Sequence, residues 1–276
     1  MEIKIRSANS DYLHGLYLPV PDARACIIMI HGLGDHINRF KNVAEFFNDN
    51  NYSFVGVDLP GHGRSPGKRG HIRDFGQYNE IISSLTDWIR EREEGLPLVL
   101  YGHSLGGTIA LKYLLDNHDI ERGIITSPWL KLSFEPPAFR LFLASVVDKI
   151  FPSMIQPSGL DPEDICSVES VINEYRNDPL VHSHISVGLF TSTMKTASKI
   201  LNCKNELKTP VLLMHSNKDR ITSAEGSAIF AGNNNMADLK IWDKGLHELH
   251  NEIFRDEVLS YIINWLDTEN GIQDKN

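Results

Sequence analysis

Cysteine, positive charge and long apolar runs are all scarce in this chain of 276 residues. Its three cysteines, Cys26, Cys166 and Cys203, lack the spacing of metal ligands and suit free thiols in a reducing compartment. The net charge of −9 disfavours nucleic acid as a partner and gives no attraction to anionic membranes. No stretch has the length of a transmembrane helix, and the first residues lack the apolar core of a signal peptide. We therefore expect a folded, cytoplasmic protein.

Short apolar runs alternate with stretches of helical periodicity along most of the chain. Continuous apolar runs such as residues 25–30 are typical of strands buried on both faces, as in a parallel sheet covered by helices. Residues 2–6 and 12–18 come before any helix, which indicates an antiparallel start to the sheet. The other expected strands are residues 25–30, 52–58, 98–101, 123–127, 210–215 and 239–242. The pattern predicts an α/β fold with a mostly parallel sheet of about eight strands and helices on both faces.

The alternation stops between residues 128 and 201, a segment rich in proline and apolar residues. Within it, residues 136–151 have helical spacing with only a narrow polar stripe, so this helix has two faces to cover. We interpret 128–201 as an inserted helical lid on a core of residues 1–127 and 202–276. Two alternatives stay open for the helix. Either one face packs on the core while the other lines an apolar pocket or touches lipid, or the whole helix is buried.

Gly102, Ser104 and Gly106 form a G-x-S-x-G motif between an expected strand and an expected helix. In such a turn the serine has a strained backbone, and side chains two residues before or after it would clash. Ser104 Oγ then stands exposed above the sheet, with the amide of Leu105 pointing to a developing oxyanion. An ordinary glycine-rich turn is the alternative interpretation, but the flanking strand and helix favour a catalytic nucleophile.

A serine nucleophile needs a base, and the base needs a carboxylate to set its tautomer. On an α/β scaffold these groups follow the order serine, acid, histidine, each just beyond the C-terminal end of a strand. Asp219 and His247 meet both conditions. The sequence therefore predicts a catalytic triad of Ser104, His247 and Asp219.

Other carboxylates are weaker candidates for the catalytic acid. Asp238 and Asp243 lie close to the last strand, whereas Asp219 follows its own strand and precedes the histidine by the length of a strand. Asp58 also follows a strand, but we interpret it and Arg64 as a structural pair that holds their loop.

Three histidines compete with His247 as the base. His31 starts a loop and is expected to fix it, His250 begins the last helix, and His103 is expected to point into the structure. Because each of these rings has a structural role available, His247 is the predicted base.

Residues 31–36, His-Gly-Leu-Gly-Asp-His, follow a buried strand, and glycines there allow backbone amides to face a ligand. The amide of Leu33 is the predicted second oxyanion donor beside that of Leu105. Asp35 and His36 are expected at the entrance of the site. The residues expected to contact substrate are Gly32, His103, Trp129, Phe142, Ile221 and Leu246.

Several motifs together resemble those of one protein family. They are residues 31–36, Asp58-Leu-Pro-Gly-His-Gly-Arg-Ser65, Gly102-His-Ser-Leu-Gly-Gly107, Ser127-Pro, Asn177-Asp-Pro-Leu180, Asp219-Arg220 and His247-Glu248. This set runs over nearly the whole chain and is similar to that of the monoacylglycerol lipase and lysophospholipase family of α/β hydrolases. The resemblance implies an α/β-hydrolase fold and a serine hydrolase whose lid admits one acyl chain, without metal or organic cofactor. It also implies the catalytic roles of Ser104, Asp219 and His247 and the oxyanion roles of Leu33 and Leu105.

The substrates that the resemblance implies are small lipid esters of glycerol or of a lysophospholipid. Leu33 is larger than the small residue usual at its position in monoacylglycerol lipases, which narrows the site or shifts its substrate preference. Plant caffeoyl-type esterases and some bacterial esterases are similar in the same motifs. The excess apolar surface of the lid helix, with Phe139, Phe142 and Phe151, predicts transient membrane contact.

Other functions compete with lipid ester hydrolysis. They are a short-chain carboxylesterase, a proline-type aminopeptidase and a cofactor-free haloperoxidase on the same scaffold. The apolar lid argues against the aminopeptidase, which needs an acidic site for a free amino terminus. A non-catalytic binding scaffold would lack a member of the triad, and none is missing.

Overall fold

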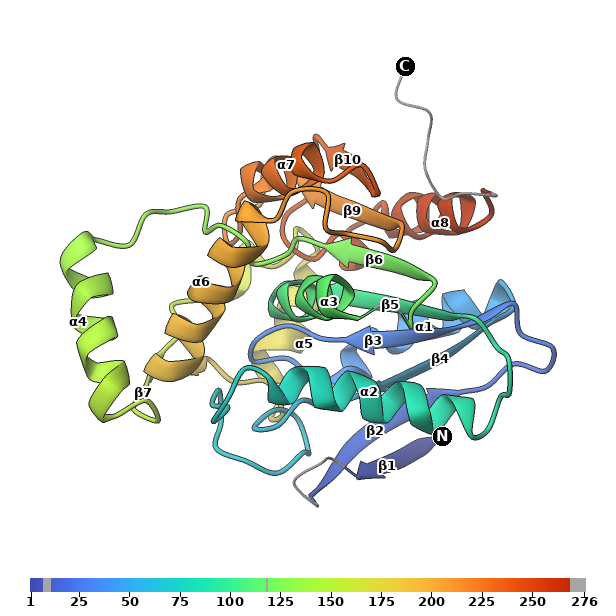
Figure 1. Cartoon of the computed structure of the whole chain (residues 1–276), viewed down its shortest axis with the longest axis horizontal. Coiled ribbons are helices and arrows are strands. Elements are labelled where there is room, and N and C mark those ends of the chain that lie inside the picture. Colours follow the sequence, from blue (N-terminus) through green and yellow to red (C-terminus); the bar gives the residue numbers. More distant parts are fainter. Residues whose placement is uncertain (7–10, 118, 269–276) are drawn as a thin grey trace.

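The computed structural model describes residues 1–6, 11–117 and 119–268 (Figure 1). An eight-stranded sheet forms its centre, in the order β1-β2-β4-β3-β5-β6-β9-β10. The strands are β1 (Glu2–Arg6), β2 (Tyr12–Leu18), β3 (Ala25–Ile30), β4 (Tyr52–Val57), β5 (Leu98–His103), β6 (Arg122–Thr126), β9 (Val211–Ser216) and β10 (Ala237–Trp242). β2 pairs antiparallel with β1 and β4, and all other pairs in this sheet are parallel. The predicted mostly parallel sheet with an antiparallel start is confirmed.

Side chains of β3 point alternately to the two faces of the sheet, and both faces are covered. Cys26, Ile28 and Ile30 belong to the core under α2, α3, α6 and α7. Ile27 and Met29 belong to the core under α1 and α8. These helices are α1 (Lys41–Asp49), α2 (Gln77–Arg90), α3 (Leu105–Asp116), α6 (Val187–Asn202), α7 (Ala224–Asn233) and α8 (Arg255–Leu266). Burial on both faces explains why the strand is apolar at every position, and the predicted α/β layering is confirmed.

The segment between β6 and β9 adds no strand to the central sheet. It contains α4 (Ala138–Ile150), β7 (Ile155–Pro157), the short 3₁₀ helix η2 (Pro162–Asp164), α5 (Glu169–Asn177), β8 (His184–Ser186) and α6. β7 and β8 pair antiparallel as a separate hairpin, which the sequence pattern does not reveal because each strand has only three residues. The lid boundaries at 128 and 201 stay a prediction.

Helix α4 stands apart from the central sheet and packs against α6 (Figure 1). None of its residues is buried, so the alternative of a fully buried helix is wrong. Apolar side chains surround more of α4 than the neighbouring helix, α6, can cover. The large apolar side chains exposed on α4 and its flanks are Phe134, Phe139, Leu141, Phe142, Leu143, Val146, Ile150, Phe151 and Met154. Among the residues that the structure describes, no helix combines the length and hydrophobicity needed to cross a bilayer.

Candidate active site

The predicted site residues come from loops at one edge of the sheet. β3, β5, β9 and β10 run parallel, so their C-terminal ends lie on the same side. Ser104 follows β5 directly, Asp219 follows β9 and His247 follows β10. The topology therefore brings together residues that are far apart along the chain.

Ser104 lies in a strained turn between β5 and α3. Its φ and ψ angles are 56° and −118°, a conformation that non-glycine residues rarely adopt. A Cβ on Gly102 would lie 2.4 Å from the carbonyl oxygen of Gly106, and a Cβ on Gly106 would lie 2.1 Å from that of Ile30. Glycine is thus required on both sides of Ser104, for the steric reason that the motif predicts.

The two predicted oxyanion donors have free N–H groups. Leu105 is the first residue of α3, and no side chain caps this helix. Within the described part of the chain, the amides of Leu33 and Leu105 donate no hydrogen bond. Leu33 follows Gly32, where a Cβ would lie 3.2 Å from Ser104 Cβ. Two unpaired amides so close to a serine can stabilise a negatively charged oxygen.

Asp219 and His247 form a buried acid–histidine pair. His247 Nδ1 lies 2.7 Å from Asp219 Oδ2. Burial alone would raise the pKa of Asp219, but the neighbouring His247 holds it well below its usual range. Burial alone would lower the pKa of His247, but the charge of Asp219 outweighs it and raises that pKa. His247 donates through Nδ1 to the carboxylate, which leaves Nε2 to accept a proton.

Ser104 and His247 line the same cavity, whose volume of about 20 Å³ is enough for about one water molecule. Its wall is formed by Gly32, Leu33, Asp35, His103, Ser104, Leu160, Ile165, Tyr175, Ile221, His247 and Glu248. Among the predicted substrate contacts, Gly32, His103 and Ile221 therefore lie beside Ser104.

The other three predicted substrate contacts do not form this wall. Phe142 is 70% exposed on α4, because that helix turns its apolar face to solvent. Trp129 is buried, with its ring 6.0 Å from that of Phe190. Leu246 is held in its loop by a hydrogen bond from its amide to Glu252, 2.7 Å away. In this structure these three side chains lie outside the wall of the small cavity, and their contact with substrate stays a prediction.

The rival residues have structural partners. His31 accepts a hydrogen bond from the amide of Leu59 (2.9 Å), and its Nδ1 lies 2.8 Å from the carbonyl oxygen of Gly32. These bonds fix the loop that His31 starts, as predicted, and also tie it to the loop of Leu59. His250 lies in the 3₁₀ helix η3 (Leu249–Asn251) before α8 and stacks on Phe40, with ring centroids 4.9 Å apart.

Asp58 also has a structural role, with one change from the prediction. Its carboxylate accepts hydrogen bonds from the amides of Ile37 and Arg64, each at 2.8 Å. The guanidinium of Arg64 binds Glu2 instead, so the contact with Asp58 runs through the backbone. Of the remaining acids, Asp238 accepts from the indole of Trp265, and Asp243 is exposed.

Sequence reasoning missed a buried ionic cluster around Arg39. The guanidinium makes two bonds to Glu248, at 2.9 and 2.8 Å, and lies 3.1 Å from Asp35 Oδ2. Its Cζ also lies 4.7 Å from the ring centroid of Tyr175 on α5. Close by, His36 Nε2 lies 2.9 Å from Asp178. The cluster joins three parts of the chain: the loop after β3, the loop after β10 that carries His247 (the histidine loop), and α5.

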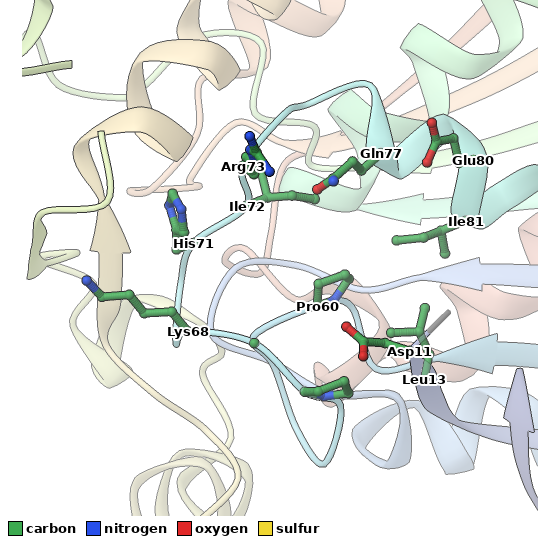
Figure 2. Close-up of a pocket in the computed structure, with 12 residues that line it drawn as sticks. Asp11, Leu13, Pro60, Lys68, His71, Ile72, Arg73, Gln77, Glu80 and Ile81 are labelled. Atoms are coloured by element: carbon green, nitrogen blue, oxygen red, sulfur yellow. The ribbon is translucent and has the colours of Figure 1, made fainter. Parts of the chain in front are cut away.

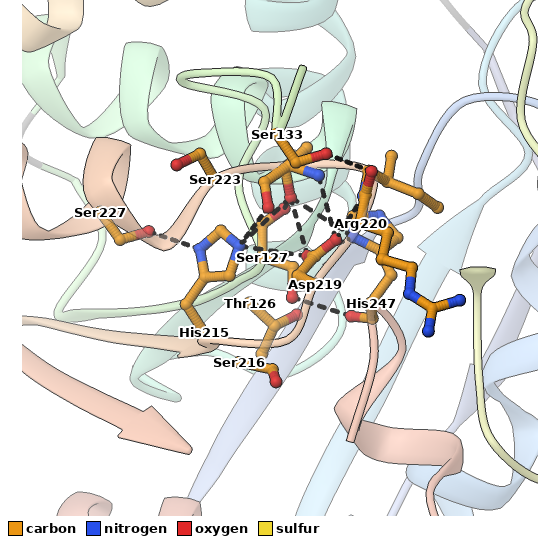
Figure 3. A network of polar contacts seen from close by, with 12 residues as sticks. Thr126, Ser127, Ser133, His215, Ser216, Asp219, Arg220, Ser223, Ser227 and His247 are labelled. Carbon is orange, nitrogen blue, oxygen red and sulfur yellow. Dashed lines mark hydrogen bonds and ion pairs between the residues drawn. The ribbon is translucent and has the colours of Figure 1, made fainter. Parts of the chain in front are cut away.

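Ser127 is a second missed residue, and it supports His247. Its hydroxyl donates to the carbonyl oxygen of His247 at 2.8 Å. Figure 3 shows this contact beside Asp219. The dipeptide Ser127-Pro contributes to the family resemblance, but nothing in the sequence indicates its partner.

A larger cavity of about 280 Å³ lies away from Ser104, near the start of α2 (Figure 2). Apolar side chains such as Leu13 and Ile81 line it together with Lys68, Arg73 and Glu80. No serine or cysteine is among its lining residues, so it supplies no hydroxyl or thiol nucleophile of those two kinds. Among the described residues, no three His, Cys, Asp or Glu side chains are grouped as metal ligands would be.

The strained serine turn after a central parallel strand, together with the sheet order, defines the α/β-hydrolase class. A family model described as "Serine aminopeptidase, S33" matches residues 21–253. The chain belongs to this family of α/β hydrolases, to its monoacylglycerol lipase and lysophospholipase members, and is an ester-hydrolysing enzyme. The resemblance noted in the sequence is confirmed.

Alignments with known relatives cover most of the chain. An uncharacterised abhydrolase domain-containing protein of Dictyostelium discoideum is 32% identical over 88% of this chain, which spans only 26% of that protein's length. A phospholipase of Bacillus subtilis is 31% identical to this chain, and the alignment covers 85% of this chain and 92% of the phospholipase. The crystal structure of a monoacylglycerol lipase from Paleococcus ferrophilus superposes with a TM-score of 0.85 at 30% identity, covering 92% of this chain and 98% of the other.

Proposed function

We propose that this enzyme hydrolyses monoacylglycerols or lysophospholipids through a Ser104–His247–Asp219 triad and an acyl-enzyme intermediate. The observation that carries the proposal is the buried His247–Asp219 pair, whose histidine lines one cavity with the strained Ser104. The similarity to a monoacylglycerol lipase and to a phospholipase supports the choice of lipid esters.

The proposed reaction uses the residues in a fixed order. Nε2 of His247 takes the proton of Ser104 Oγ as the oxygen attacks the ester carbon. The resulting oxyanion accepts hydrogen bonds from the amides of Leu33 and Leu105. Each bond contributes about 3 kcal/mol of transition-state stabilisation. The protonated His247 then gives its proton to the leaving alcohol, and water releases the fatty acid by the same route. Asp219 stays ionised throughout and stabilises the imidazolium.

A cavity of about 20 Å³ is far too small for an acyl chain, so substrate binding requires opening. Leu160, Ile165 and Tyr175, which close the wall, all lie in the segment 128–201. This supports the interpretation of that segment as a lid over the core. Part of it is bonded to the histidine loop, because the amide of Glu248 donates to the carbonyl oxygen of Ile165 at 2.7 Å.

Release of acid from a matched substrate panel tests the proposed function. The panel is 1-monoacylglycerol, lysophosphatidylcholine, p-nitrophenyl butyrate and prolyl-p-nitroanilide. We expect turnover of one of the two lipids to exceed that of the butyrate by about tenfold or more, because remote binding of the acyl chain lowers the barrier. Preference for the butyrate would indicate a short-chain carboxylesterase. Preference for the anilide would indicate an aminopeptidase, although the carboxylates in the wall, Asp35 and Glu248, are already paired with Arg39.

We also infer that α4 touches lipid during catalysis. Exposed large apolar side chains recur along α4 and its flanks from Phe134 to Met154, and the net charge of −9 leaves apolar contact as the driving force. We propose a location in the reducing cytoplasm, which the few cysteines support. The proposed contact of α4 with lipid is peripheral to the membrane.

Replacing Phe139, Phe142 and Phe151 together with serine is expected to weaken binding to phosphatidylcholine vesicles by about tenfold or more, because three aromatic rings no longer leave water. Vesicle co-sedimentation measures the effect. Ile253→Ser is the matched control, because Ile253 is 88% exposed but lies outside α4. Equal vesicle binding by the triple variant and the control would rule out the lipid contact.

A further inference from the structure

His215, the fifth residue of β9, is completely buried beside the loop that carries Asp219 (Figure 3). Its Nδ1 lies 2.8 Å from Ser227 Oγ on α7, and its Nε2 lies 3.1 Å from Asp219 Oδ2. Nε2 also lies 3.2 Å from the carbonyl oxygen of Thr222. Both ring nitrogens therefore have partners, and one partner is the proposed catalytic acid.

The partners of Nε2 show that this nitrogen of His215 carries a proton. The carboxylate of Asp219 and the carbonyl of Thr222 can only accept hydrogen bonds, so Nε2 carries the proton. Nδ1 pairs with the hydroxyl of Ser227, which can donate or accept. The N–H at Nε2 has Asp219 Oδ2, the same oxygen that His247 Nδ1 contacts, as its nearest acceptor, with the carbonyl oxygen and hydroxyl of Thr222 at 3.2 and 3.3 Å.

The two oxygens of Asp219 are held differently. Oδ1 accepts from the amides of Ile221 and Thr222, at 2.8 and 3.0 Å. Oδ2 lies near His247, His215 and the hydroxyl of Thr222. The Thr222 hydroxyl also lies 3.1 Å from the carbonyl oxygen of Ser127. Because it has a single proton, it divides that proton between Asp219 Oδ2 and this carbonyl oxygen. Backbone amides therefore hold Oδ1, whereas His215 and the hydroxyl of Thr222 contact Oδ2 beside His247.

We propose that His215 is a positioning residue that holds the carboxylate of Asp219 in line with His247. The inference rests on the proposed triad. His247 gains positive charge as it takes the proton from Ser104, and a carboxylate that is already oriented stabilises this charge without rearrangement. Without His215 the Oδ2 atom loses one of its three contacts and is held less firmly opposite His247. We expect this loss to raise the energy of the transition state rather than to weaken substrate binding.

The test compares kcat and KM for p-nitrophenyl butyrate, with active sites counted by fluorophosphonate titration. His215→Leu is expected to lower kcat per active site by about 10- to 100-fold, the effect of one hydrogen bond to a charged group, with KM changed less than about twofold. His215→Gln returns an N–H donor near the position of Nε2 and is expected to stay within about fivefold of the wild type.

His250→Phe is the matched control, because His250 is equally buried but its ring packs on Phe40. We expect it to keep kcat per active site within about threefold of the wild type. A kcat for His215→Leu within about twofold of the wild type, or equal losses in His215→Gln and His215→Leu, would overturn the proposal.

If His215→Leu fails to fold by circular dichroism, His215→Asn replaces it. The shorter asparagine amide does not reach Asp219, so the proposal requires its kcat to lie about tenfold below that of His215→Gln. Equal activities of these two variants would overturn the proposal. A wild type that turns over no ester would contradict the proposed function itself. If the wild type is active and His215→Leu has the same kcat per active site, only the role of His215 is contradicted.

Discussion

Replacing Ser104 with alanine is expected to lower kcat for ester hydrolysis by about 10⁴-fold or more, which is roughly 5 kcal/mol of transition-state stabilisation. The change removes the oxygen that attacks the ester, so no acyl-enzyme forms and His247 has no proton to take. Steady-state kinetics on the preferred substrate of the panel measure the loss. We expect the melting temperature to stay close to that of the wild type, since alanine keeps the Cβ that this strained turn already accommodates.

Ser84→Ala is the matched control for this variant. Ser84 lies on α2, and its hydroxyl donates to the carbonyl oxygen of Glu80 within the same helix. Its replacement is expected to leave kcat unchanged. Activity of Ser104→Ala within about tenfold of the wild type, or fluorophosphonate labelling that persists in it, would contradict the nucleophile. A wild type without either activity or labelling would favour the non-catalytic scaffold.

Replacing Arg39 with methionine is expected to lower the free energy of unfolding by about 3 to 5 kcal/mol, the cost of breaking a buried ion pair from one side. Arg39 is 11% exposed, and its partners Asp35 and Glu248 are each 4% exposed. Methionine fills a similar volume but leaves both carboxylates buried without a cation. It also removes the guanidinium stacked on Tyr175, so the contact with α5 weakens as well. Urea unfolding at pH 7 measures the change.

The deficit of this variant should depend on pH. In the wild type, burial would raise the pKa of Glu248, but Arg39 holds it well below its usual range. Without Arg39 the largest influence that opposes burial is lost, so we expect the pKa of Glu248 to rise above the value of about 4.3 that it has in the unfolded chain. The folded variant then binds a proton more tightly than the unfolded one, and its deficit narrows as the pH falls from 7 towards about 4.

Lys41→Met is the control for Arg39→Met. Lys41 pairs with Glu45 across one turn of α1, and both side chains are more than half exposed. Loss of such a surface pair changes stability by less than about 1 kcal/mol. An Arg39→Met variant no less stable than Lys41→Met, or one whose deficit stays constant from pH 7 to about 4, would contradict the role assigned to the cluster.

Local patterns were sufficient for most of the framework. The apolar run of β3 predicts a strand buried on both faces, and the structure places alternate side chains in two cores. The glycines beside Ser104 predict its strained turn, because the clash that excludes a side chain there involves atoms a few residues away or on the adjacent strand. The order of Ser104, Asp219 and His247 also places them at one edge, since parallel strands end on the same side.

What the sequence determined by itself is therefore the alternation of elements, the serine turn and the order of the candidate triad, all of which depend on short spacings and on strand direction. Only the tertiary structure decided which side chains support the triad and that no residue of α4 is buried. Arg39 and Glu248 are 209 positions apart, and His215 and Ser227 lie on different elements. Such partners depend on how loops and helices meet, and the periodicity of a single element carries no information about its neighbour.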